Sequence, residues 1–324
     1  MAPTYQWRTL IKLAMLAALV MQSALAQDYP SKPINIIVPY DAGGTTDVVI
    51  RLVQLRMIPI LGQAITVENR TGAGGLIGTE VVAKAAPDGY SLLGTFDSFA
   101  AVPFLYSNVN HDPIKDFAPI SLLIRAPQVL VVNPGLGLKN VAEFLQLAKG
   151  KGPELAFSTA GPGSSSRLTM ELFKSMAKID TTLVSYNGGG PALNAVLGGH
   201  VAGFMASIGT AFSNVKGGKL VALAVSSKQR APLLANVPTL AESFPGYEAQ
   251  SWVGLQAPAA TSPAIVRRLN AAAVKVLAAP DTKQILESQG MEVVASTPEV
   301  YAEWVHEQMK TWGPIIQSLH IKLN

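Results

Sequence analysis

The stretch INIIVPYDAGGTTD, residues 34–47, decides the fold class. Its first five residues, Ile34–Val38, are mostly β-branched and apolar, which is typical of a buried strand, and Pro39 ends the run. A glycine turn follows, and from Val48 onward apolar residues recur at helical spacing. A short buried strand, a glycine turn and a helix in this order predict one unit of a mainly parallel α/β sheet.

The same order of strand, turn and helix returns further along the chain. Further strands are expected at residues 64–68, 90–95, 155–158 and 182–185. The glycine turns that follow strands are Gly72–Gly75, Gly161–Ser165 and Gly188–Gly190. Helices are expected from about Asp47, from Ser164 and from Pro191, since proline is well placed in a first helical turn. The fold class is therefore predicted to be α/β.

Two extended segments, Val129–Pro134 and Ser251–Pro258, follow two separate blocks of these units. They are expected to cross between two lobes. We predict a discontinuous first domain, residues 27–127 plus 248–324, with a continuous second domain, residues 128–247, inserted in it. A ligand cleft is expected between the two α/β lobes, because the carboxyl ends of parallel strands meet at one edge of each sheet.

The first 26 residues have the pattern of a secretory signal peptide. Arg8 and Lys12 supply positive charge, an apolar run extends over residues 13–21, and Ala24-Leu25-Ala26 matches the small-residue cleavage pattern. The run is short of the roughly 20 residues that span a bilayer, so a membrane anchor is the weaker alternative. We predict cleavage before Gln27 and export to the periplasm.

Composition narrows the classes of function. Removal of the leader takes two positive charges, so the formal charge falls from 25 − 21 = +4 to 23 − 21 = +2. Lysines and arginines do not cluster with aromatic residues, which argues against a nucleic-acid partner. The chain has no cysteine, which excludes disulfides, thiolate metal sites and a cysteine nucleophile. We expect a monomer that needs no metal and no cofactor.

A glycine turn that leads into a helix presents free backbone N–H groups at the positive end of the helix dipole. Such a turn binds a carboxylate, phosphate or sulfate group without a cationic side chain. One turn of this kind is common in α/β proteins, but four of them at strand ends point to capture of a small anion. Neutral polar side chains lie beside the turns and also suit the role of helix caps. They are Thr45, Thr46, Ser158, Thr159, Ser164, Ser165 and Asn187.

Three enzymatic alternatives compete with this interpretation. The run Gly72–Gly78 has the spacing G-x-G-G-x-x-G, not the dinucleotide-binding G-x-G-x-x-G, and it follows the second strand of the fold. A secreted hydrolase that uses a serine of the Ser164–Ser166 turn is the stronger alternative, although G-x-S-x-G is missing. The four histidines have neither triad context nor metal-ligand spacing, which argues against a metal hydrolase. We therefore expect a protein that is not an enzyme.

Taken together, these segments resemble the Bug family, the TctC-type solute receptors of tripartite tricarboxylate transporters. The resemblance extends from Tyr29 to the C-terminal helices. It is carried by the ordered segments 29–34, 38–44 with Asp47, 67–75, 87–90, 161–164, 188–192, 238–242 and 257–259.

The resemblance implies a fold like that of type II periplasmic-binding proteins, closing by a hinge around a small carboxylate, which is delivered to the membrane permease subunits of the transporter. It also implies that the turn after the first strand and the Gly-Ser turn of the second lobe hold the carboxylate. With the turn argument, this gives the candidate ligand-binding residues Tyr40, Ala42, Gly43, Gly44, Asp47, Phe96, Ser158, Thr159, Gly163, Ser164, Ser165, Asn187 and Gly188.

The chain departs from the family pattern at several positions near this site. Asp41 stands where a small or neutral residue is common, and Arg167 replaces a frequent histidine. The stretch Asp97–Ala100 also differs from the usual polar sequence after the third strand. Since a carboxylate side chain pairs with a cation, Asp41 leaves room for an amino-bearing ligand, and an aromatic acid is a further option.

Overall fold

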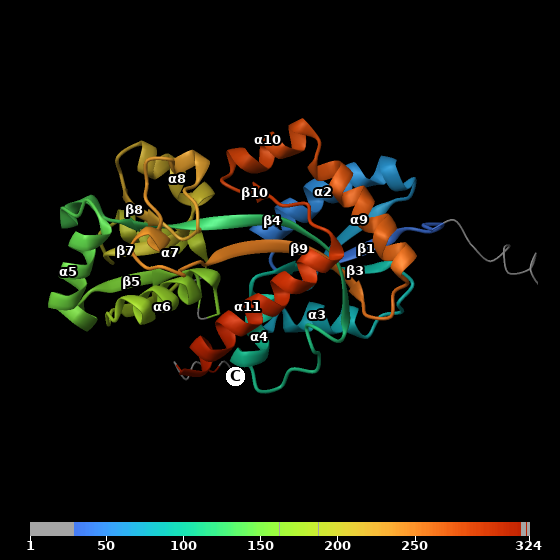
Figure 1. Cartoon of the computed structure of the whole chain (residues 1–324), viewed down its shortest axis with the longest axis horizontal. Helices are drawn as coiled ribbons and strands as arrows, with labels where there is room; N and C mark the ends of the chain where they lie inside the picture. Colours follow the sequence, from blue (N-terminus) through green and yellow to red (C-terminus); the bar gives the residue numbers. More distant parts are fainter. Residues whose placement is uncertain (1–28, 162, 187, 319–321, 323–324) are drawn as a thin grey trace, which may run out of the picture.

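The computed structural model describes residues 29–161, 163–186, 188–318 and 322. Strands and helices alternate along this chain and form two lobes side by side, which confirms the α/β prediction (Figure 1). The predicted leader, its cleavage site and Asn187 lie outside the described residues. Among the described helices, none combines the length and the apolar character needed to cross a membrane.

The strands are β1 (Ile34–Val38), β2 (Ile65–Asn69), β3 (Ser91–Phe96), β4 (Phe117–Val132), β5 (Ala156–Thr159), β6 (Thr182–Ser185), β7 (Gly203–Ser207), β8 (Val221–Val225), β9 (Gln250–Pro258) and β10 (Glu292–Val293). The α-helices are α2 (Thr45–Leu61), α3 (Leu76–Ala83), α4 (Ser98–Leu105), α5 (Val141–Lys151), α6 (Ser165–Ala177), α7 (Gly189–Leu197), α8 (Ile208–Lys216), α9 (Pro263–Leu277), α10 (Pro280–Ser288) and α11 (Pro298–Ser318). Short 3₁₀ turns cover Ala73–Gly75, Pro134–Leu136, Gly152–Glu154, Pro232–Leu234 and Leu240–Glu242.

Both lobes have the same strand order. In the first lobe the order is β2-β1-β3-β9-β4, with β1, β2 and β3 parallel and β9 antiparallel to β3. In the second lobe it is β6-β5-β7-β4-β8, with β5, β6 and β7 parallel and β4 antiparallel to β7. Each lobe therefore has three parallel strands whose carboxyl ends share an edge, followed by one antiparallel strand that arrives from the other lobe.

The long strand β4 joins the two sheets. Residues 117–127 of β4 pair with β9, and residues 128–132 pair with β7 and β8. In Figure 1, β4 runs along the length of the molecule from one lobe into the other. The two crossing strands are tied together at the boundary, because the side chain of Gln128 donates to the hydroxyl of Ser251 across 3.2 Å.

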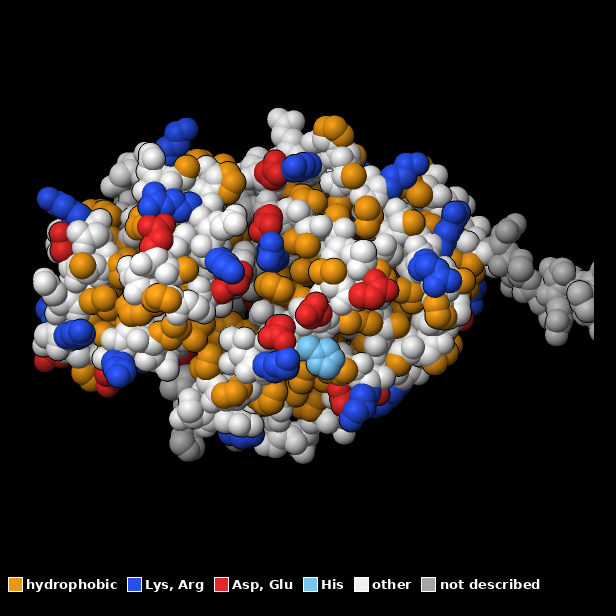
Figure 2. Space-filling view, in the orientation of Figure 1, with side chains coloured by type: hydrophobic (Ala, Val, Ile, Leu, Met, Phe, Trp, Pro, Cys, Tyr) orange, Lys and Arg blue, Asp and Glu red, His pale blue; other side chains and the backbone are white. Residues whose placement is uncertain are grey.

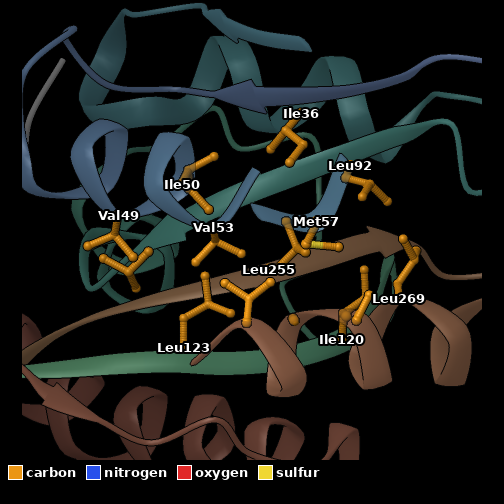
Figure 3. Close-up of a cluster of buried hydrophobic side chains, with 14 of the residues drawn as sticks. Ile36, Val49, Ile50, Val53, Met57, Leu92, Ile120, Leu123, Leu255 and Leu269 are labelled. Carbon is orange, nitrogen blue, oxygen red and sulfur yellow. The ribbon is translucent and has the colours of Figure 1, made fainter. Parts of the chain in front are cut away.

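The core of the first lobe lies between its sheet, α2 and α9. Val49, Ile50, Val53 and Met57 of α2 are each at most 1% exposed and pack against strand residues such as Leu255 (Figure 3). These residues recur every three to four positions, so one face of the helix is apolar and buried. This packing fixes the direction of α2, and its N-terminus points at the boundary between the lobes.

A second apolar cluster crosses that boundary. Trp312 and Ile316 of α11 and Leu105 of α4 belong to the same buried cluster as Phe173 of α6 and Leu130 of β4. The C-terminal helix therefore starts against the first lobe and ends against the second. The domain boundaries given above stay a prediction, since buried contacts of this kind connect the two units.

Helix starts differ from the expected ones by one or two residues. The first helix begins at Thr45 and not at Asp47, and α7 begins at Gly189 and not at Pro191. In both cases a glycine with non-helical backbone angles stands directly before the helix, Gly44 for α2 and Gly188 for α7. Thr45 and Thr46 look like turn residues in sequence, but their β-branched side chains are tolerated in a first helical turn.

Candidate functional site

The turn between β1 and α2 has unpaired N–H groups, but they are not those of its two glycines. Gly43 N donates to the carboxylate of Asp47 (2.9 Å), and Gly44 N donates to the carbonyl of Asp41 (3.2 Å). The first bond inside the helix is from Val48 N to Gly44 O. The N–H groups of residues 45–47 therefore make no hydrogen bond to any described part of the chain. The N–H groups of Gly43 and Gly44 are therefore used within the turn, and the free donors of α2 follow them.

Asp47 holds this turn in shape. Its carboxylate, only 4% exposed, accepts hydrogen bonds from Gly43 N, from Arg51 Nε at 2.9 and 3.0 Å, and from Asn69 Nδ2 at 2.9 Å. Burial by itself would raise the pKa of this carboxyl, but the bonds from Arg51, Gly43 and Asn69 outweigh it and lower the pKa. With its oxygens occupied by these donors, Asp47 positions the turn and is not placed to contact an anion.

The turn between β5 and α6 is held by hydroxyl groups. Ser164 is the N-cap of α6: its Oγ accepts from Arg167 N (3.4 Å) and donates to Gly161 O (2.7 Å). The hydroxyl of Ser166 lies 2.9 Å from that of Ser164 and accepts from Ala160 N at 2.9 Å. The backbone N–H groups of residues 165 and 166 are left without a partner among the described residues, as the helix-terminus argument expects.

Two predicted residues lie below this turn. Ser158, 1% exposed, donates its hydroxyl hydrogen to Ala192 O at 2.9 Å, so it ties β5 to α7 inside the second lobe. Thr159 is fully buried, and its hydroxyl lies 3.2 Å from that of Ser185. Both side chains are buried, and their hydroxyls form hydrogen bonds inside the second lobe, so neither is free to contact a ligand in the cleft.

Gly188 connects the two turns of the second lobe. Its N–H donates to Ala160 O (3.1 Å) and to Tyr186 O (3.0 Å), and its backbone has a φ of 102°, which favours glycine. Gly163 lies in the neighbouring turn and is partly exposed. The structure thus brings Gly188, Gly161 and Ser164 into one corner of the second lobe.

Tyr40 and Phe96 stand at the ends of β1 and β3. Their rings meet edge to face at 5.8 Å, and the hydroxyl of Tyr40 lies 2.9 Å from that of Ser98. Burial raises the pKa of Tyr40, and the bond to Ser98 only partly opposes this rise, so the phenol stays neutral. The two rings pack against each other at the strand ends, and neither lines the cavity described below.

A cavity of about 180 Å³ lies where the N-terminus of α2 faces the N-terminus of α8. Its lining consists of Gly43, Thr45, Val48, Ala126, Pro127, Ser207–Thr210 and Gln289–Met291. The two helices come from different lobes, and neither N-cap, Gly44 or Ser207, makes a side-chain capping bond. Two helix N-termini that converge on one space favour a negatively charged occupant.

The segment Ser207–Thr210 is not among the residues predicted from the sequence, although it stands where a strand gives way to a helix. It has one glycine instead of a glycine-rich run, so the turn criterion does not select it. Ser207 and Thr210 hydrogen bond to one another through their hydroxyls at 2.6 Å. The carboxyl end of a parallel strand would be a better criterion in the sequence than a glycine-rich turn. β7 is the third parallel strand of its lobe, and Ser207 stands at its carboxyl end.

A larger recess, about 1180 Å³, lies between the lobes at the segment 227–233 that follows β8, at α10 and at β10. It contains none of the predicted residues and no N-terminus of α2 or α6. Lysine, arginine, aspartate and glutamate side chains are interspersed along the boundary between the lobes on the face in Figure 2. The smaller cavity is the better candidate site, because helix N-termini are directed into it.

The chain matches the family model described as the tripartite tricarboxylate transporter family receptor over residues 49–321. It belongs to this receptor family. It is 33% identical to Protein BugT of Bordetella pertussis over 301 residues, which cover 92% of each chain. These findings confirm the resemblance stated from the sequence.

Solved structures of similar proteins have the same architecture. MatC (Rpa3494) from Rhodopseudomonas palustris, with bound malate, is 33% identical, with a TM-score of 0.77 over 89% of this chain and all of that one. Rpa4515 of R. palustris, with adipate, is 30% identical, with a TM-score of 0.81 over 91% and 100%. The periplasmic binding protein BugD is 32% identical, with a TM-score of 0.78 over 91% and 100%. The two-lobed fold predicted from the sequence is confirmed.

This receptor is a solute-binding protein and not an enzyme, so the serine hydrolase alternative is wrong. The geometry gives the physical reason. The hydroxyls of Ser164 and Ser166 bond to each other and to nearby backbone, and His111 packs against the rings of Phe99 and Phe117. In the described part of the chain, no three potential ligands among His, Asp and Glu gather to hold a metal.

Proposed function

We propose that this receptor captures a small carboxylate between its two lobes and delivers it to the membrane subunits of a tripartite tricarboxylate transporter. The observation that carries the proposal is the cavity at which α2 of one lobe and α8 of the other present their N-termini. The N–H groups of residues 45–47 lack partners in the described chain, and Thr45 lines the cavity. An unpaired N–H group of this kind is a donor that a carboxylate oxygen satisfies. Relatives that bind malate and adipate support the same chemistry.

The binding step is a closure of one lobe on the other. The ligand first occupies the N-terminus of one helix, and the second lobe then supplies further donors and excludes water. The backbone change falls at the two crossing segments near Gln128 and Ser251, where β4 and β9 pass between the sheets. The closed form is the shape that the permease subunits recognise. The receptor acts as an exported monomer, with its leader removed before Gln27.

The ligand-binding residues proposed from this geometry differ in part from those named in the sequence. Gly43, Gly44, Gly163, Ser164 and Gly188 shape the turns, and Tyr40 and Phe96 pack against each other at the strand ends. Donors to the ligand within the cavity are the N–H groups that open α2 and α8, and the N-terminus of α6 does not line this cavity. Asp47, Ser158 and Thr159 support these turns from behind.

Thr45→Pro tests the assignment of the α2 N-terminus. Proline is tolerated at a first helical position, and Gly44 before it has φ −71° and ψ 168°, which a following proline accepts. The substitution removes one free N–H and leaves the helix intact. We expect the affinity for malate or adipate, measured by isothermal titration calorimetry, to fall about tenfold, since a hydrogen bond to a charged group contributes about 1.5 kcal/mol.

Thr45→Ala is the matched control, because it removes the side chain and keeps the N–H group. Its affinity should stay within about threefold of the wild type, which corresponds to under about 1 kcal/mol. Equal affinities for the proline variant and the wild type would remove α2 from the site. Loss of binding in the alanine variant alone would assign recognition to the hydroxyl.

A further inference from the structure

Asp97 is a buried carboxylate that has no well-formed hydrogen bond and no cationic partner in the described chain. It occupies the N-cap of α4 and is 5% exposed, yet it makes no capping bond to the helix. Neither carboxylate oxygen has a hydrogen-bond partner among the described residues. An aspartate at this position ordinarily accepts a bond from the second or third N–H of its own helix. Here the side chain turns away from that role.

The carboxylate lies where the two lobes meet. The hydroxyl of Ser251, on crossing strand β9, and that of Ser165, the first residue of α6, are near enough to favour its ionised form. Ser251 accepts a hydrogen bond from Gln128, which leaves its hydroxyl hydrogen to point elsewhere. Asp97 therefore lies at the N-terminus of α6, in the corner that also holds the turn of Ser164.

The electrostatic surroundings compensate this carboxyl only in part. Burial raises its pKa to about 7, while Ser251, Ser165 and the N–H of Ser98 oppose the rise. From the β1 side the neighbouring ionisable group is the neutral phenol of Tyr40. On α6, Arg167 lies 3.8 Å from Glu171, and Asp47 is occupied by Arg51. No cation of the described chain lowers the pKa of Asp97.

We propose that Asp97 is a specificity-determining residue that pairs with an ammonium group of the ligand, so that the receptor selects small carboxylates that also carry an amino group. This rests on the carboxylate-binding function proposed above. An ionised carboxylate about 6 Å from a ligand carboxylate, at an effective dielectric constant of about 20, weakens binding about a hundredfold. An ammonium group at the same place is attracted to the carboxylate and therefore strengthens binding. The carboxylate end then occupies the helix N-termini, and the amino group faces Asp97.

The structure favours Asp97 over Asp41 as the residue that recognises the amino group. Asp41 is exposed, in the β1–α2 turn, where water screens its charge. Asp97 is buried at the boundary, where an unpaired charge has a much larger effect on a nearby ion. The departure from the family pattern at Asp97 is therefore the one that bears on the ligand.

Two matched ligand pairs test the proposal on the wild-type receptor: succinate with aspartate, and adipate with 2-aminoadipate. Each pair differs by one amino group. At pH 8, calorimetry should give at least tenfold tighter binding of the amino-bearing member of one pair or both. Asp97→Asn should abolish that preference, whereas Asp41→Asn should leave it. The amide has the size of the acid and removes an unpaired buried charge, so its unfolding temperature should equal or exceed that of the wild type.

The pH dependence of the wild type provides an independent readout. Ionised Asp97 is the binding form, so affinity for the amino-bearing ligand should fall as the pH is lowered from 8 to 6, and the Asp97→Asn substitution should remove this slope. Dicarboxylates should respond in the opposite way, because protonation of Asp97 removes its repulsion of a second ligand carboxylate. An affinity for the amino-bearing ligand that rises as the pH falls would overturn the proposal. A preference that Asp41→Asn removes and Asp97→Asn keeps would also overturn it, with the carboxylate function intact. If no member of either pair binds, both proposals fail.

Discussion

Asp47→Asn is the sharpest test of how the β1–α2 turn is built. The buried carboxylate receives donors from three groups: Gly43 N, the guanidinium of Arg51 and the amide of Asn69. An asparagine has the same shape, but it replaces one acceptor oxygen by a donor NH₂ group, so at least one donor in the cluster meets another donor.

The expected loss of unfolding free energy follows from the number of hydrogen bonds that Asp47→Asn removes. One buried donor left without an acceptor costs about 1–3 kcal/mol. The lost ion pair with Arg51 adds little, because the arginine side chain is 44% exposed and water screens it. We expect Asp47→Asn to lower the free energy of unfolding by about 2 kcal/mol in urea titrations at pH 7. Asp41→Asn removes the same charge from an exposed position in the same turn and should change it by less than about 0.5 kcal/mol.

The pH dependence has a definite sign. The pKa of Asp47 is lower in the folded state than its ordinary value of 3.8. Its contribution is therefore present above pH 3.8 and is lost as the pH falls through the lower, folded-state pKa. The difference in unfolding free energy between the wild type and Asp47→Asn should shrink below about pH 4. Equal effects of the two substitutions at pH 7 would refute the idea that Asp47 holds the turn.

Two further substitutions distinguish residues that stabilise the fold from residues that affect ligand binding. Ser158→Ala removes a buried hydroxyl that is hydrogen bonded to α7, so it should lower the unfolding free energy by about 1 kcal/mol. The affinity for a carboxylate should stay within about twofold of the wild type. A tenfold loss of affinity at unchanged stability would instead place Ser158 in the binding site. Gly209→Ala places a Cβ 2.5 Å from the backbone oxygen of Gln289 in the other lobe, so it should hinder closure and weaken carboxylate binding about tenfold in calorimetry. Gly150→Ala, with nothing within 4 Å of the new Cβ, is its control, and an equal effect of both would rule out closure at Gln289.

The fold is predictable because local and global signals agree in this chain. The strand Ile34–Val38 has the bounds that the sequence predicts, since proline and glycine punctuate a β-branched run. The two-lobed order follows from the repeated units and from two isolated extended segments. The sequence does not reveal that β4 is one strand of 16 residues serving both sheets, because its second half alone has the pattern of a crossing.

The candidate site is predictable as a set of turns but not as a set of donors. Glycines mark where the backbone bends, and which N–H groups stay free depends on contacts between distant residues, such as Asn69 with Asp47. Ser158 is a candidate in the sequence because it precedes a turn, yet its hydroxyl faces the interior of the lobe. The burial of Asp97 is not visible in the sequence, because it arises where two lobes built from distant segments meet.

A carboxylate, held at helix N-termini from both lobes, is the ligand that we propose for this receptor. The most direct measurement is the unfolding free energy of the exported chain with malate, adipate, aspartate or 2-aminoadipate, each beside its neutral amide analogue. A ligand at a hundred times its dissociation constant should stabilise the native state by about 2.7 kcal/mol. We predict this stabilisation with at least one carboxylate and none with its amide. Equal stabilisation by the amide, or none by any carboxylate, would contradict the account.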